Sequence, residues 1–261
     1  MKWGCCGDME QVATIMNAGY EYIESPVRAL AIGEPESSAQ PFFDAVKKSG
    51  LSVEAFNVFV SAELPIVGPN VDDVALRAHV DSIVSRVDGL NTSIIVLGSG
   101  GARTIPDGWD PQAARSQFLS FCSLAADAVT QAGLTIVIEP LAESTCNFIH
   151  TVNEALELAE ETGKPEIAAL ADLYHMHMND DPIETLAAVA AQLRHVHLPV
   201  PTLPGVIDKG LAFDHPRYLH ALKDGGYDGR ISVEDNGKRF TDFDREAKPV
   251  LEYLKKTWDS F

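Results

Sequence analysis

The stretch TIVIEPL, residues 135–141, reads as a short apolar strand that ends in an acid, Glu139, and a proline. On its N-terminal side, Asp110-Pro111 opens a segment with apolar residues on one helical face, and Gly133 closes it. On its C-terminal side the next strand candidate is IAALADL, residues 167–173, which also carries an acid near its end. Strand and helix therefore alternate on both sides of this stretch.

The same alternation runs along the whole chain. The strand candidates span 2–6, 20–25, 53–59, 92–97, 135–141, 167–173, 194–198 and 230–235. Eight strands alternating with helices in 261 residues predict an α/β fold, a single (β/α)8 TIM barrel that forms one domain over residues 1–261. A doubly wound open sheet is the alternative, but the first strand–helix turn, at residues 5–8, lacks a G-x-G-x-x-G fingerprint. The irregular segment 199–213 is expected to be a loop over the active-site face.

Composition and charge exclude several classes of protein. The chain has a net charge of −18, which disfavours binding to a phosphate backbone, so no nucleic-acid partner is expected. It contains no apolar run long enough for a membrane span, and the start lacks the apolar stretch of a signal peptide. The four cysteines form no C-x-x-C pair, which fits a reduced compartment, so we expect a cytoplasmic location.

Acids and one histidine recur at the ends of four consecutive strand candidates. Glu139, Asp172, His197 and Glu234 are separated by 33, 25 and 37 residues, each close to one strand–helix unit. Barrel enzymes place their chemistry at the carboxyl ends of the strands. Three carboxylates in one mouth would repel one another, and a divalent cation relieves that repulsion. Two glutamates, one aspartate and one imidazole therefore predict one metal ion, with Mn²⁺ preferred and Mg²⁺ or Co²⁺ as alternatives.

A second histidine accompanies His197 in the stretch HVHLP, residues 195–199. A strand alternates its faces, so His195 and His197 point the same way. Burial of two imidazoles requires a partner for each. We expect the metal to be the partner of His197. His195 lies two residues deeper and is expected to meet a buried carboxylate.

Several stretches together resemble a known family. They are GYEYIESP, VIEPL, ALADLYHMHMNDDP, RHVHL, the PG at 204–205 and GGYDGRISVED, and they are spread over nearly the whole chain. In their order and spacing they are similar to the xylose-isomerase-like TIM barrels, in particular to the sugar isomerase/epimerase branch with hydroxypyruvate isomerase and the ketose 3-epimerases. The resemblance assigns the metal-ligand positions of that family to Glu139, Asp172, His197 and Glu234.

The resemblance also implies roles in the reaction. It makes Glu139 and Glu234 the catalytic acid/base pair, one on each face of the substrate carbon, and it makes His175 a substrate-binding residue. It is compatible with a homo-oligomer. The epimerases usually carry a further glutamate and an arginine where this chain has Thr145 and Leu203. The grip on the substrate is therefore expected to differ, and Glu143 is a candidate for the missing glutamate.

The stretch LGSGGAR, residues 97–103, follows the fourth strand candidate. Small residues allow backbone N–H groups to approach an anion, and an arginine can bind a phosphate or carboxylate with two hydrogen bonds. We therefore expect Arg103 to lie on the rim of the barrel and to bind an anionic or strongly polar end of the substrate. The alternative is a glycine turn with a solvated arginine.

These observations favour a metal-dependent isomerase or epimerase that transfers a proton at carbon on a small ketose, keto acid or sugar derivative. The alternative is a metal-dependent lyase or dehydratase, including the C-glycoside-cleaving type, that acts on an oxidised sugar or cyclitol. A third reading is a barrel retained as a binding module, against which the complete set of ligand types argues. The expected partner is a small carbohydrate-like molecule.

Overall fold

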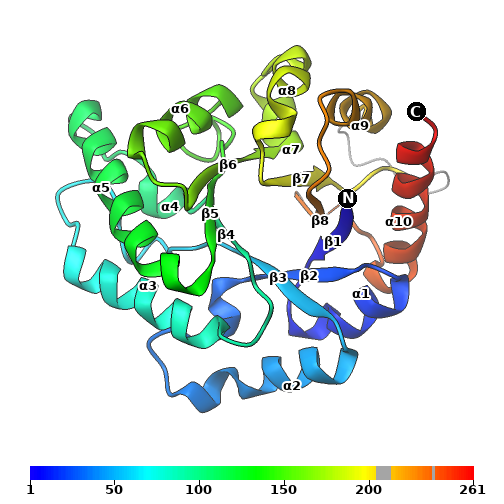
Figure 1. Ribbon diagram of the computed structural model, residues 1–261, viewed down its shortest axis with the longest axis horizontal. Coiled ribbons are helices and arrows are strands. Elements are labelled where there is room, and N and C mark those ends of the chain that lie inside the picture. The colour runs from blue at the N-terminus through cyan, green and yellow to red at the C-terminus, as the bar shows by residue number, and fades with distance from the viewer. Residues whose placement is uncertain (204–212, 237–238) are drawn as a thin grey trace.

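The computed structural model describes residues 1–203, 213–236 and 239–261, and these form a closed barrel of parallel strands surrounded by helices (Figure 1). The strands are β1 (Lys2–Cys6), β2 (Tyr22–Pro26), β3 (Ser52–Asn57), β4 (Ile94–Leu97), β5 (Thr135–Ile138), β6 (Ile167–Asp172), β7 (His195–Pro199) and β8 (Arg230–Glu234). Each strand pairs with the next, and β8 pairs with β1 to close the barrel. The predicted (β/α)8 barrel is confirmed.

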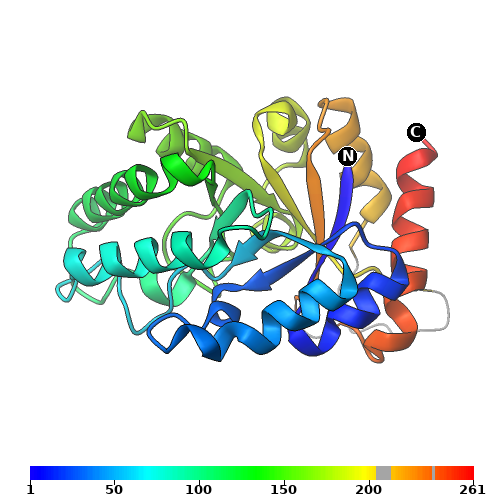
Figure 2. The same cartoon turned by 60° about the horizontal axis from the view of Figure 1, so that its bottom comes forward.

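The helices lie outside the strands. They are α1 (Val12–Ala18), α2 (Gln40–Ser49), α3 (Asp73–Val87), α4 (Gly100–Arg103), α5 (Pro111–Val129), α6 (Val152–Thr162), α7 (Leu173–Met178), α8 (Ile183–Val189), α9 (His215–Asp224) and α10 (Phe243–Asp259). Short 3-10 segments are η1 (Met9–Gln11), η2 (Val27–Leu30), η3 (Glu36–Ala39), η4 (Thr130–Ala132) and η5 (Ala190–Gln192). The last helix, α10, lies beside α1 and completes the ring (Figure 2). No helix in the described part of the chain is long and apolar enough to cross a membrane.

Local sequence explains where the helix before β5 begins and ends. The Asp110 side chain accepts a hydrogen bond from the Gln112 amide, and Pro111 occupies the first helical position of α5. After η4 the chain turns at Gly133, whose φ of 67° lies in the left-handed region that favours glycine. The predicted helix boundaries are confirmed here, and they set the point at which β5 enters the barrel.

The interior of the barrel has an apolar half and a polar half. The apolar half is a separate cluster on β3 to β6, made of Ala55, Ile94, Val96, Val137 and Leu170. The polar half is carried by buried residues of β2, β7 and β8, namely Tyr22, Glu24, His195, His197 and Ser232. Buried polar groups need hydrogen-bond partners, so the side chains of the polar half are expected to bond to one another.

One glycine makes room for this polar half. A Cβ at Gly4 on β1 would lie 2.2 Å from the ring of Tyr22 on the neighbouring strand. The absence of a side chain lets the Tyr22 ring fill the barrel, where its hydroxyl lies 2.9 Å from Ser232 Oγ. At the amino-terminal end of the barrel, Glu54 connects the starts of β1 and β8. It accepts hydrogen bonds from Lys2 Nζ at 2.8 Å and Arg230 Nε at 2.5 Å. The chemistry-bearing residues lie at the other end.

The long irregular connection predicted at 199–213 lies after β7. Pro199 ends the strand, and α9 begins at His215. His215 Nε2 lies 2.8 Å from the Pro199 carbonyl oxygen, which fixes the start of α9 against the end of β7. Residues 204–212, with the PG at 204–205, lie outside the described part of the chain.

Candidate metal centre

The four residues predicted as metal ligands lie together at the carboxyl ends of β5 to β8. Glu139 follows β5, Asp172 ends β6, His197 lies in β7 and Glu234 ends β8. One ligand atom from each lies within 4.8 Å of the other three. Glu234 is partly exposed and the other three are buried, so the cluster reaches solvent on the Glu234 side. The barrel therefore brings together the four residues that the strand-end pattern predicted.

The imidazole of His197 points one nitrogen at all three carboxylates. Its Nδ1 lies 2.9 Å from Glu139 Oε1, 3.2 Å from Glu234 Oε2 and 3.7 Å from Asp172 Oδ2. One N–H can donate properly to only one of these oxygens, whereas a cation attracts all of them. Oxygen donors with one imidazole suit a hard or borderline divalent ion. The residues present therefore fit a single metal ion.

The electrostatics of the cluster show the same crowding. Burial and the neighbouring charges of Asp172 and Glu139 raise the pKa of Glu234 to about 7. Burial alone would lower the pKa of His197, but the surrounding carboxylates hold it well above its ordinary value. Without a metal, protons compensate the negative charge. A divalent ion would take the place of those protons.

A residue that the sequence analysis missed, Glu24 on β2, holds His197 from behind. Its Oε1 lies 2.9 Å from His197 Nε2 and its Oε2 lies 2.7 Å from His195 Nε2. Glu24 is fully buried, and although burial raises its pKa, the two imidazoles bring it well below the ordinary value. With a carboxylate on Nε2, loss of the Nδ1 proton to an incoming metal ion would leave the Nδ1 lone pair facing the three carboxylates, which is the arrangement of a metal-binding histidine. The prediction that His195 meets a buried carboxylate is confirmed.

The aspartate of the cluster is oriented by the helix that follows it. Asp172 Oδ1 accepts hydrogen bonds from the amides of Tyr174 at 2.7 Å and His175 at 3.0 Å and so caps α7. This leaves Oδ2 directed at His197. Burial raises the pKa of Asp172, but the adjacent imidazoles and these hydrogen bonds hold it well below its ordinary range. Asp172 is therefore fixed as a carboxylate in one orientation.

The predicted substrate-binding residue His175 lies next to the cluster. Its Nδ1 accepts a hydrogen bond from the Ala142 amide at 3.0 Å, and its Nε2 lies 3.9 Å from Asp172 Oδ2. A backbone N–H can only donate, so the neutral ring carries its proton on Nε2. The imidazole therefore presents an N–H beside the cluster.

The predicted position of Arg103 is wrong. The side chain is fully buried and does not lie on the rim. Its guanidinium donates to the carbonyl oxygen of Glu139 at 2.6 Å and to that of Leu97 at 3.4 Å. The Leu97 carbonyl ends β4 and also accepts a hydrogen bond from the Glu139 amide at 3.3 Å, whereas the Glu139 carbonyl lies directly after β5. The guanidinium therefore binds the barrel itself, and the geometry gives no support to a role in anchoring the substrate.

An asparagine completes the polar surroundings of the cluster. Asn236 Nδ2 donates to Glu234 Oε2 at 3.0 Å and lies 3.3 Å from Asp172 Oδ2. It lies two residues after Glu234 and had no motif to mark it in the sequence. Its amide orients the carboxylate that is closest to solvent.

The positions at which the chain departs from the epimerases offer no charged group. Thr145 is exposed and Leu203 is partly buried against the core. Glu143 is exposed, and its amide donates to Asn179 Oδ1 at 3.0 Å. An arginine reaches the segment of Leu203 from another loop, because Arg239 Nε donates to the Val200 carbonyl oxygen at 2.9 Å.

A second group of metal-binding residue types lies on the other side of His197. Cys6, Glu24 and His197 Nε2 also come within reach of one another. Here, however, Glu24 and Nε2 are already bonded to each other. Burial and the charges of Glu24 and Glu234 raise the pKa of the Cys6 thiol well above its ordinary value, so this sulfur stays protonated. The group of carboxylates is the better metal site.

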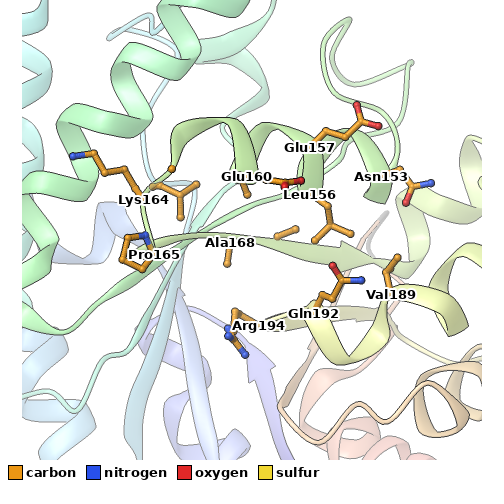
Figure 3. Close-up of a pocket in the computed structure, with 14 residues that line it drawn as sticks. Asn153, Leu156, Glu157, Glu160, Lys164, Pro165, Ala168, Val189, Gln192 and Arg194 are labelled. Carbon is orange, nitrogen blue, oxygen red and sulfur yellow. The ribbon is translucent and has the colours of Figure 1, made fainter.

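A hollow of about 780 Å³ lies over the first residues of β6, between α6 and the segment 189–194 (Figure 3). It is bordered by α6 and by residues just before β6 and β7, such as Lys164, Pro165 and Arg194. Asp172 ends β6 and His197 lies within β7, both further along these same strands. Its lining includes none of the predicted site residues, so this hollow is separate from the candidate metal centre.

The fold and the cluster define a class of protein. Residues 12–257 match the family described as Xylose isomerase-like TIM barrel, and this chain belongs to that family. The resemblance drawn from the sequence is confirmed.

Particular relatives can be named. A ketose 3-epimerase of Arthrobacter globiformis is 28% identical over 110 residues, which make up 42% of this chain and only 37% of the relative. The structure is similar to D-psicose 3-epimerase from Clostridium cellulolyticum H10, with a TM-score of 0.81 and 17% identity over 99% of both chains. It is also similar to 3-keto-D-glucoside 4-epimerase from E. coli, with a TM-score of 0.78 and 19% identity over 98% of this chain and 99% of that one. At these identities the structural matches show a shared fold.

Proposed function

We propose that this chain is a divalent-metal-dependent isomerase or epimerase that transfers a proton at a carbon of a small ketose, keto acid or sugar derivative. The observation that carries the proposal is the convergence of His197 Nδ1 and three carboxylates at the carboxyl ends of β5 to β8. The similarity to a ketose 3-epimerase supports the same class of reaction.

The residues of the cluster would have two roles, metal binding and proton transfer. Glu139, Asp172, His197 and Glu234 would hold the metal, which when bound would polarise neighbouring substrate oxygens and acidify the C–H bond between them. One of the two glutamates takes the proton from carbon, and the C–H electron pair moves into the adjacent carbonyl. The return of a proton to carbon from the other glutamate completes the reaction. Substrate and product then have the same mass.

We propose that His175 donates its Nε2 proton to a substrate oxygen. The Ala142 amide occupies Nδ1, so the ring cannot present the opposite tautomer without losing that hydrogen bond. His175 is also buried, which excludes competing water and strengthens a hydrogen bond to substrate.

We further propose Mn²⁺ as the metal, with Mg²⁺ or Co²⁺ as alternatives, because oxygen donors outnumber the single imidazole. The small carbohydrate-like substrate and the cytoplasmic location are part of the same proposal. The net charge of −18 supports the absence of a nucleic-acid partner.

The test is solvent exchange. The metal-reloaded protein is incubated in D₂O with ketoses, keto acids and oxidised sugars, and the masses of the products are measured by mass spectrometry. We expect deuterium at carbon in a product of otherwise unchanged composition. Loss of water from the product would instead favour the dehydratase. A carefully reloaded protein that holds no divalent ion would contradict the proposal.

A further inference from the structure

We propose that Gly98 and Arg103, which lie after β4, position Glu139 for its role in the centre. This inference rests on the proposed function, because it concerns the glutamate that serves there as metal ligand and acid/base group. It gives the LGSGGAR stretch a role other than the binding of a substrate anion.

Gly98 provides the space that the Glu139 carboxylate fills. A Cβ at Gly98 would lie 2.0 Å from Glu139 Oε2 and 3.2 Å from its Cδ. The backbone of Gly98 is not in the left-handed region, so its conformation does not call for glycine. The requirement at this position is room for the carboxylate.

The contact with Gly98 also sets the rotation of the carboxylate. Oε2 lies against Gly98 while Oε1 lies 2.9 Å from His197 Nδ1. A methyl group on residue 98 would push Oε2 away, and Oε1 would turn with it because the two oxygens share one rigid group. The distance from Oε1 to the position of the metal would change as a consequence.

Arg103 holds the main chain of the same glutamate. One guanidinium nitrogen donates to the Glu139 carbonyl oxygen at 2.6 Å, and the other donates to Leu97. Among the described residues the hydrogen bonds of the Arg103 guanidinium go to main-chain carbonyls and not to a carboxylate, and its Nε has no hydrogen-bond partner. A fully buried charge without a carboxylate partner is costly. The guanidinium charge and the Glu139 carboxylate attract each other beyond ion-pair distance.

The backbone that carries Gly98 and Arg103 is fixed from the other side. Ser99 Oγ accepts a hydrogen bond from the Val60 amide at 2.9 Å, and the Ala102 carbonyl oxygen accepts one from the Ile66 amide at 2.8 Å. Ser99 has a φ of 42°, an uncommon value for a residue other than glycine. The loop after β3 therefore fixes the backbone of residues 99–102 by two hydrogen bonds.

A double-mutant cycle on Mn²⁺ affinity tests the inference. Gly98→Ala and Gly100→Ala each add one methyl group to the same short segment. The first methyl meets the Glu139 carboxylate, whereas the second lies 3.1 Å from Leu141 Cδ1, the movable tip of a side chain. We expect Gly98→Ala to weaken Mn²⁺ binding by about tenfold or more and Gly100→Ala to change it by less than about threefold.

The cycle is closed in a Glu139→Ala background, where the space beside residue 98 is empty. There Gly98→Ala should change Mn²⁺ affinity by less than about twofold, because its target has been removed. If Gly98→Ala unfolds the protein, melting temperatures in the same cycle serve as the readout, and the double variant should regain stability relative to Gly98→Ala.

Two results would overturn the inference. Either Gly98→Ala binds Mn²⁺ as the wild type does, or its loss is the same in both backgrounds. Failure of the proposed function looks different, because the wild-type protein itself would then take up no metal.

Discussion

Substitution of Glu24 by glutamine tests how the barrel interior prepares His197 for a metal. In the wild type the buried carboxylate lies within hydrogen-bond distance of His195 Nε2 at 2.7 Å, His197 Nε2 at 2.9 Å and Ser232 Oγ at 2.7 Å. A glutamine has the same shape but offers one acceptor and one donor. It can serve only one of the two imidazoles as the carboxylate does.

Both orientations of the amide have a cost. If its oxygen faces His197, its NH₂ group forces the proton of His195 onto Nδ1, which is buried without a partner among the described residues. An unpaired buried donor costs about 1–3 kcal/mol. If the amide is reversed, the proton of His197 moves to Nδ1, the atom that would bind the metal. Loss of a carboxylate behind a metal-binding histidine typically costs about 10- to 100-fold in metal affinity, which is about 1.4–2.7 kcal/mol.

The assay is a titration of metal-free protein with Mn²⁺, followed by the EPR signal of the free ion, with the melting temperature measured in parallel. We expect Glu24→Gln to weaken binding by about 10- to 100-fold. The matched control is Glu54→Gln, at the other end of the barrel, which removes ion pairs to Lys2 and Arg230. It should lower stability and leave the Mn²⁺ dissociation constant within about twofold. Wild-type affinity and melting temperature in Glu24→Gln would refute the reasoning.

Three further predictions follow from the geometry. Mn²⁺ affinity should rise with pH, by at least about tenfold per unit below about pH 7, because binding displaces protons from Glu234 and His197. The pKa of Glu234 is raised to about 7, and the pKa of His197 is held well above its ordinary value by the surrounding carboxylates; a flat profile in the same titration would contradict this. Glu139→Gln and Glu234→Gln should each reduce deuterium exchange at carbon by at least about a hundredfold at equal metal loading, because an amide cannot take the proton; near wild-type exchange by either loaded variant would remove that glutamate from the acid/base pair. Gly4→Ala should lower the free energy of unfolding by about 1–3 kcal/mol, because its methyl would lie 2.2 Å from the Tyr22 ring, and an unchanged denaturation midpoint would show that the barrel accommodates it.

The barrel and the positions of the predicted metal-binding residues could be predicted because both depend on short, local patterns in the sequence. The strands β5 and β6 are apolar runs and β8 is mostly apolar, and Glu139, Asp172 and Glu234 mark the points where these runs end. Parallel strands place such ends at one rim. Spacing along the chain was therefore enough to bring these side chains together.

Glu24 could not be found in this way. It lies on β2 and meets His195 and His197 on β7 only because β8 and β1 close the barrel between them. The partner of a buried histidine is set by that closure and not by sequence distance. The signal that could have found it is the acid in the middle of the strand stretch YIESP, residues 22–26, since a buried carboxylate needs partners of its own.

Arg103 shows the limit of motif reasoning. A glycine-rich turn followed by arginine fits an anion loop on the surface as well as a short helix that buries its arginine. Two features of the folded barrel decide between them: the space that Gly98 leaves for Glu139, and the Glu139 carbonyl oxygen just after β5, which accepts a hydrogen bond from Arg103. Neither feature can be read from residues 97–103 alone.

Anomalous diffraction from a crystal grown with Mn²⁺ tests the central claim most directly. We expect one peak, with His197 Nδ1 and one oxygen each of Glu139, Asp172 and Glu234 within about 2.0–2.6 Å of it. The Nε2 of His197 should remain bonded to Glu24. Absence of a peak from this position, or a peak on the Nε2 side between Cys6 and Glu24, would contradict the account.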